Sequence, residues 1–111
     1  MSEKVLVVTT ETIAGHHVVE TIGEVFGLTT RSRNVLSSFG QSMKAIVGGE
    51  IKGYTKLQDA ARDEAIDRLK TAAAEVDANA VVMMRFDSSS GAIGDSVTAY
   101  GTAVKIEKDL D

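Results

Sequence analysis

The sequence predicts an α+β domain of two layers, in which a small mixed or antiparallel sheet carries two helices on one face. Three observations predict it: a long helical pattern over residues 53–76, a buried strand pattern that follows it at residues 80–86, and an alternating pattern over residues 97–106. With 111 residues, the chain is long enough to form one domain, residues 1–111, with a core of its own. The expected order of elements is β-β-α-α-β-β.

Two strands are expected in the first part of the chain. Residues 5–9 are apolar and rich in β-branched side chains, as is typical of a short strand. Residues 18–28 form the second strand pattern, which Gly23 and Gly27 interrupt. Glycines inside strands usually mark bulges or bends, so we expect the second strand to bend at these two positions.

Two helices are expected next, each with an apolar stripe at helical spacing. The stripe of the first comprises Leu36, Phe39, Met43, Ile46 and Val47. This helix ends at Gly48-Gly49, a usual stop signal. The stripe of the second comprises Leu57, Ala61, Ala65, Leu69, Ala72, Ala73 and Val76. Because most of that stripe is alanine, we expect the long helix to lie close against the sheet.

The ends of the long helix also have sequence signals. Thr55 and Gln58 have the spacing of a capping box, which predicts that Thr55 is the N-cap residue. Glu64 and Arg68 are spaced for an i,i+4 ion pair in the favourable order. At the other end, Asp77 or Asn79 is expected to take the left-handed conformation that usually falls to glycine.

Both faces of the sheet are expected to be partly apolar. On the last strand, the small face that should lie under the long helix comprises Val97, Ala99, Gly101 and Ala103. The opposite face of that strand carries Tyr100, Val104 and Ile106. On the third strand, alternation places Val82, Met84 and Phe86 together on one face. A flexible loop over residues 88–95 should join the two strands. Since two helices do not cover both faces of a sheet, we expect the second face to meet another subunit.

The composition excludes several classes of function. The net charge of −4 and the presence of only five aromatic residues argue against nucleic-acid binding, and the absence of cysteine excludes disulfides and thiolate metal sites. No apolar run approaches membrane length, and the N-terminus does not resemble a signal peptide, so a cytoplasmic location is expected. No nucleophile elbow and no acid–base pair can be identified by spacing, which favours a protein without enzymatic activity.

We expect no cofactor, and the alternative is a divalent metal, for which two sets of residues are candidates. His16 and His17 form the histidine cluster, but neighbours on an extended segment point to opposite sides, so only several copies in a ring would bring them together. Asp59, Asp63 and Asp67 share one helix face and would suit calcium or magnesium. Exposed histidines and a solvated helix face are the alternative interpretation.

Several motifs resemble those of the YbjQ family, in order and over nearly the whole chain. They include Thr9-Thr10, Ile46-Val47-Gly48-Gly49, Ala61-Arg62, Ala78-Asn79-Ala80-Val81-Val82, Arg85-Phe86-Asp87 and Gly101-Thr102-Ala103-Val104. The resemblance implies a small α+β subunit, akin to dodecin subunits, in a homopentameric ring. It also implies a heavy-metal-binding label without an established function, and the missing cysteines weaken that interpretation because soft metals favour thiolates. The chain departs from the family pattern at Asp77, where glycine is common, and at Ser37-Ser38, where an Arg-Asp pair is common.

The resemblance also suggests interface residues. Tyr54 and Arg62 match the family on the long helix, and with Arg85 and Asp87 of the third strand they are expected to line a pocket between subunits. A set of hydrogen bonds and ion pairs within the subunit is the alternative. The sequence therefore predicts a non-enzymatic homo-oligomer, a pentameric ring whose partner is itself, which binds a small ligand or ion at subunit interfaces. A metal-handling protein that uses the histidines or the aspartate row is the second hypothesis.

Overall fold

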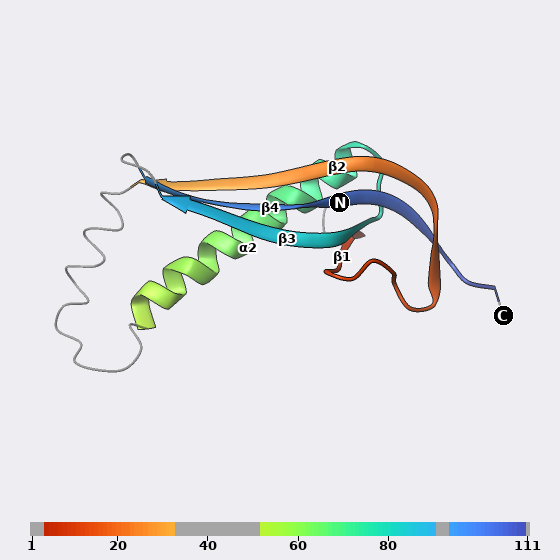
Figure 1. Ribbon diagram of the computed structural model, residues 1–111, viewed down its shortest axis with the longest axis horizontal. Helices are drawn as coiled ribbons and strands as arrows, with labels where there is room; N and C mark the ends of the chain where they lie inside the picture. Colours follow the sequence, from red (N-terminus) through yellow and green to blue (C-terminus); the bar gives the residue numbers. More distant parts are fainter. Residues whose placement is uncertain (1–3, 33–51, 91–93, 111) are drawn as a thin grey trace.

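The computed structural model describes residues 4–32, 52–90 and 94–110, without the side chains of residues 31–32 and 52–57. Its elements are β1 (Leu6–Val7), β2 (His16–Ser32), α2 (Lys52–Glu75), β3 (Ala80–Ser90) and β4 (Gly94–Lys108). The four strands form one sheet in the order β1-β3-β4-β2, with α2 running obliquely across one face (Figure 1). The predicted α+β class and mixed sheet are confirmed, and the first predicted helix falls on residues 33–51, outside the described residues.

The sheet is mixed because one pair of strands is parallel. β1 pairs with the start of β3 in parallel, and β4 pairs with both β3 and β2 in antiparallel fashion. The β2–β4 ladder runs from His16 opposite Lys108 to Ser32 opposite Gly94. The prediction of a flexible loop over residues 88–95 is wrong for most of these residues, since β3 continues to Ser90 and β4 begins at Gly94. Serines pair there as ordinary strand residues, and the Oγ atoms of Ser89 and Ser96 lie 2.8 Å apart.

The sequence predicts the C-terminal end of α2 correctly but not its N-terminal end. Thr55 is not the N-cap, because α2 already begins at Lys52 and places Thr55 inside helical backbone. At the other end, Asp77 has a φ of 65°, as predicted. The N–H of Ala78 donates to the Ala73 carbonyl and that of Asp77 to the Ala74 carbonyl, both at 3.0 Å, which is a Schellman motif. Val76, the last member of the predicted stripe, is 42% exposed because the helix has already ended.

The main core lies between α2 and the sheet, as the alanine stripe predicts. Its helical side comprises Ala61, Ala65, Leu69 and Ala73, and its strand side includes Val25, Val97, Ala99 and Ala103. The closest approach is at Gly27 of β2, where an added Cβ would lie 2.1 Å from the Ala65 carbonyl oxygen. Gly27 therefore serves close packing and does not mark a bend, whereas Gly23 stands at a register shift with a φ of 146°. Gly101 makes room for β3 and not for the helix, since a Cβ there would lie 2.6 Å from Val81 Cγ1.

A bulge in β3 changes which side chains share a face. The ladder with β4 shifts between Val82 and Arg85, and Met83 has a φ of 57°. The N-terminal segment fixes this bulge, because the Thr10 carbonyl accepts the Met83 N–H at 3.0 Å. As a result Met84 packs in the main core while Val82 does not, so the predicted common face of Val82, Met84 and Phe86 is wrong.

The far face of the sheet has a second, smaller core at one end. Its buried members are Ala80, Val82 and Val104, and Val8, Ile13 and Ile106 pack against them. Val104 is only 2% exposed, although the sequence suggested that it would meet another subunit. The chain's own N-terminal segment covers it instead, which strand alternation alone does not reveal.

Candidate functional site

The far face of the sheet also has an exposed apolar patch beyond this second core. Phe26 stands opposite Tyr100 in the β2–β4 ladder, and Leu28 lies two residues further along β2 on the same face. Phe26 is 54% exposed, Leu28 50% and Tyr100 38%. The two rings are 6.3 Å apart between centroids. We call these three residues the open-face patch.

The open-face patch has this position because β2 alternates strictly beside α2. Val25, Gly27 and Thr29 face the helix and are buried, so Phe26 and Leu28 must point to the other side. Isolated exposed apolar side chains are common on protein surfaces, but a group that includes two neighbouring aromatic rings is typical of an interaction surface.

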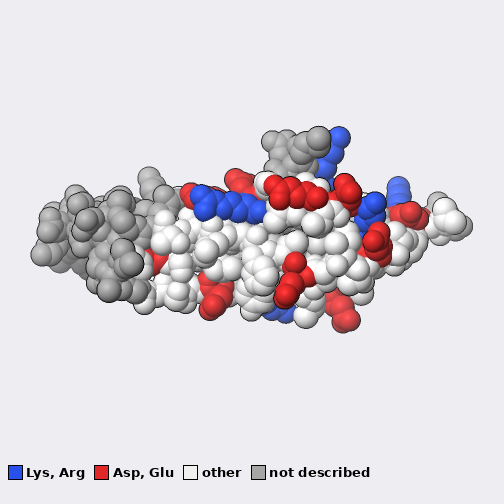
Figure 2. All heavy atoms as spheres, turned by 90° about the horizontal axis from the view of Figure 1, so that it is seen from above, with Lys and Arg blue, Asp and Glu red and all other residues white. Residues whose placement is uncertain are grey.

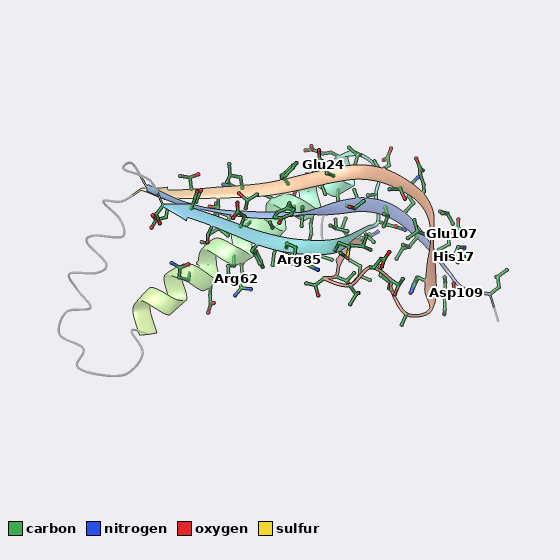
Figure 3. The ribbon with its side chains drawn as sticks, viewed as in Figure 1. His17, Glu24, Arg62, Arg85, Glu107 and Asp109 are labelled. Atoms are coloured by element: carbon green, nitrogen blue, oxygen red, sulfur yellow. The ribbon has the colours of Figure 1, made fainter. Side chains whose placement is uncertain are left out.

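Two of the residues predicted for an interface pocket border the open-face patch. Arg85 stands opposite Tyr100, and Asp87 stands opposite Thr98, which in turn faces Leu28. The Arg85 guanidinium is held at the strand, because its Nη1 donates to the carbonyls of Thr9 and Met84 at 2.8 Å each. Figure 3 shows Arg85 on β3 and Glu24 on β2, so charged side chains flank the apolar patch from different strands.

The other two predicted pocket residues do not join them. Arg62 lies on the helix side of the sheet, with its guanidinium carbon 4.6 Å from the centroid of the Phe86 ring. Phe86 and Arg85 are neighbours in a strand and therefore point to opposite faces, which separates Arg62 from Arg85. Tyr54 lies in the first turn of α2, and its side chain is among those not described.

The edge of the sheet beside the open-face patch is tied to α2 by a polar network. Thr29, which is 2% exposed, donates from Oγ1 to Glu64 Oε1 at 2.7 Å. Glu64 pairs with Arg68 at 2.8 Å, which confirms the predicted i,i+4 pair, and Arg68 also donates to the Leu28 carbonyl. The sequence pointed to the pair but not to its two partners on β2, since nothing local links residues so far apart along the chain.

The predicted histidines lie at the far end of the molecule. His16 stands opposite Lys108 and His17 opposite Glu107, so the two imidazoles leave opposite faces of β2, as expected. His17 Nδ1 is 2.9 Å from Asp109 Oδ1, with both side chains about half exposed. Figure 3 shows His17, Glu107 and Asp109 together near the C-terminus. The sequence does not predict that Asp109 lies beside His17, because the position of Asp109 depends on how far the last strand continues.

The predicted aspartate row stands on the exposed side of α2, at Asp59, Asp63 and Asp67. Within residues 4–32, 52–90 and 94–110, the structure brings together no group of three or more His, Cys, Asp or Glu able to hold a metal ion. A metal centre that uses these residues would therefore need ligands beyond those that the described part of one chain brings together. In the same described part, no helix is both long and apolar enough to cross a membrane.

The chain is similar to proteins whose function is not established. The sequence model of the family YbjQ_1, described as "Putative heavy-metal-binding", matches residues 5–107. The UPF0145 protein YjfJ of Lactococcus lactis subsp. lactis is 61% identical over 106 residues, which cover 96% of this chain and 98% of that protein. A UPF0145 protein of Enterococcus faecalis is also 61% identical, over 103 residues that cover 90% of this chain and 97% of the relative.

A solved structure is similar to the chain in fold. It is the crystal structure of a protein of unknown function from Pediococcus pentosaceus, which belongs to the DUF74 family. The TM-score is 0.53 at 17% identity, and the match covers 93% of this chain and 98% of the other. At this low identity the likeness concerns the fold alone.

Proposed function

The chain belongs to the YbjQ family, and we propose that it acts as a ring-forming homo-oligomer, a pentamer, whose subunits meet through the open-face patch. The number five comes from the resemblance to the family. The exposure of Phe26, Leu28 and Tyr100 on one sheet face is the observation that carries the proposal. Fully burying an exposed apolar side chain contributes about 1.5–3 kcal/mol, and these three are about half exposed, so covering the rest of their surface favours association by part of that value for each.

The surroundings of the patch support the same role. Aromatic residues and arginine are enriched in interfaces, and here Arg85 borders the two rings. β2 pairs with another strand of the described chain on one side only, which leaves a 17-residue edge strand. Proteins usually cover or pair such edges. A head-to-tail contact that closes on itself covers an edge and a face in every subunit.

In this assembly the contacts between subunits would provide the place for a small ligand or ion. Arg85 and Asp87 lie at the rim of the proposed contact, where their charges remain available to a bound molecule. Neither an enzymatic activity nor a particular ligand is part of the proposal. A cytoplasmic location stays a prediction from the sequence.

Light scattering coupled to size exclusion, at micromolar concentration, tests the assembly. Five chains of 11.8 kDa give about 59 kDa, and Phe26→Glu should reduce this mass by placing a charge in the contact. Val76→Glu is the matched control, because Val76 is 42% exposed at the end of the helix and away from the sheet face. A folded wild-type monomer would contradict the proposal, and a dimer would contradict only the pentamer.

A metal-handling role is the second candidate, and the contact between His17 and Asp109 favours it. A carboxylate that accepts the Nδ1–H of a histidine fixes the tautomer and leaves Nε2 free to bind a metal. Imidazole suits zinc, copper and nickel, so the chain fits such ions despite its lack of cysteine. In a ring, copies of His17 would supply ligands beyond those in the described part of one chain.

Metal analysis of the purified protein, with thermal shift on adding zinc, tests this second candidate. We expect His17→Ala to abolish the shift and Asp109→Asn to weaken binding about 10–100-fold, as is typical for the residue that orients a metal ligand. His16→Ala is the control, because the His16 imidazole leaves the opposite face of β2 from that of His17. Absence of both stoichiometric metal and a thermal shift would exclude this role. Adding calcium or magnesium in the same assay tests Asp59, Asp63 and Asp67.

A further inference from the structure

The single described helix leaves part of its sheet face uncovered. α2 packs mainly over β2 and β4 and barely touches β3. Four strands spaced about 4.8 Å apart are wider than one helix, whose diameter with side chains is about 10 Å. A pocket of about 450 Å³ opens in the uncovered part, between α2 and the β1–β3 pair. It is lined by Lys4, Val5, Leu6, Val7, Ile66, Lys70 and Met84.

The walls of this pocket are apolar for reasons that the fold explains. Val5 and Met84 belong to the main core and are 4% and 8% exposed. Met84 faces this side because the bulge at Met83 reverses the alternation of β3. Ile66 and Lys70 lie one turn apart on α2 and so point in the same direction, which brings an apolar and a cationic side chain to one wall.

The charged groups of the pocket all have the same sign. Both charged residues of the described lining are lysines, and none of the carboxylates that the structure describes lines the pocket. Among the described residues, neither Lys4 nor Lys70 forms an ion pair. The chain as a whole carries a net charge of −4, and Figure 2 shows acidic side chains spread along the described part of one face. Two described lysines without an ion pair, beside an apolar cavity, therefore contrast with the net negative charge of the chain.

We propose that this pocket binds a small organic anion with an apolar body, of the class of medium-chain monocarboxylates. The carboxylate would pair with Lys4 and Lys70, and the hydrocarbon would lie against Val5, Ile66 and Met84. The volume falls within the range of about 300–1,000 Å³ that is usual for small-molecule sites, which combine apolar walls with a few convergent polar groups. The described residues of one chain already form the apolar wall and supply both cations, so the proposal goes beyond the ring and does not require it.

Isothermal titration of the full chain with decanoate tests the site. We expect a dissociation constant below about 1 mM. Decanol, which lacks the charge, and acetate, which lacks the apolar body, should each bind at least about tenfold more weakly. Light scattering on the same samples reports the oligomeric state, so a failure of this site is distinguishable from a failure of the ring.

Variants locate the binding to this pocket. Lys70→Gln and Lys4→Gln should each weaken decanoate about tenfold, the loss typical of one charge-assisted hydrogen bond. Lys105→Gln is the control, because Lys105 is an exposed lysine of β4 outside the pocket. No binding of decanoate, equal binding of decanol, or binding that both pocket variants leave unchanged would each overturn the proposal.

Discussion

Gly27 of β2 lies directly beneath Ala65 of α2, so closely that a Cβ on Gly27 would stand 2.1 Å from the Ala65 carbonyl oxygen and 2.4 Å from the Leu69 nitrogen. Backbone therefore meets backbone at this point, and neither atom belongs to a side chain that can turn away. This contact fixes the distance between helix and sheet. Because Gly27 faces α2, its neighbours Phe26 and Leu28 point to the other side of β2, where they form the open-face patch.

The first prediction follows from this contact. Gly27→Ala must push α2 away from the sheet, so we expect a loss of about 3 kcal/mol or more in the free energy of unfolding, at the upper end for overpacking. Gly101→Ala should cost less, because its nearest atoms, Val81 Cγ1 at 2.6 Å and the Val82 carbonyl oxygen at 2.9 Å, are less close than those that face Gly27. Urea denaturation of both variants gives the comparison. Equal stability of Gly27→Ala and the wild type would show that helix and sheet are further apart.

The Schellman motif at the end of α2 gives the second prediction. Asp77 has a φ of 65°, in a region that side chains other than glycine enter at a cost. Asp77→Gly should therefore stabilise the protein by about 0.5–1 kcal/mol, and Asp77→Ala should destabilise it by a similar amount. Thermal unfolding measures both. If glycine proves worse than aspartate here, the Asp77 carboxylate makes a contribution that the backbone geometry does not explain.

The buried hydroxyl of Thr29 gives the third prediction. Thr29→Val keeps the shape but removes the hydrogen bond to Glu64, which should cost about 1 kcal/mol. Thr30→Val is the matched control, because Thr30 is exposed on the other face and should change stability by less than about 0.5 kcal/mol. Similar values for the two variants would mean that the network contributes little to holding α2 on β2.

The sequence was informative wherever a local rule decides the structure. Asp77 takes the left-handed conformation, Glu64 pairs with Arg68, and Ala99 and Ala103 lie in the core with the alanine stripe of α2. Each of these depends on residues near in sequence or on simple alternation along a strand. For the same reason, the open-face position of Tyr100 was predictable, because it follows from the small residues on either side of it.

Contacts between distant segments explain the failures. One bulge at Met83 reverses the faces of the residues that follow, and it is held by the Thr10 carbonyl, which no local pattern reveals. The burial of Val104 depends on where the N-terminal segment crosses the sheet. The predicted grouping of Arg62 with Arg85 in one pocket fails for the same reason. Arg85 reaches the open-face patch, whereas Arg62 lies on the other side of the sheet.

This separation of Arg62 from Arg85 gives the last prediction. Arg62 stacks over Phe86 within its own chain, so Arg62→Ala should cost about 0.5–1 kcal/mol in stability and leave the mass of the assembly unchanged. The cost should shrink when Phe86 is already leucine, because a double-mutant cycle isolates the energy of the cation–ring contact. Arg85→Glu, at the rim of the open-face patch, should instead reduce the mass measured by light scattering. If Arg62→Ala splits the assembly and the cycle shows no coupling to Phe86, Arg62 belongs to the contact between subunits.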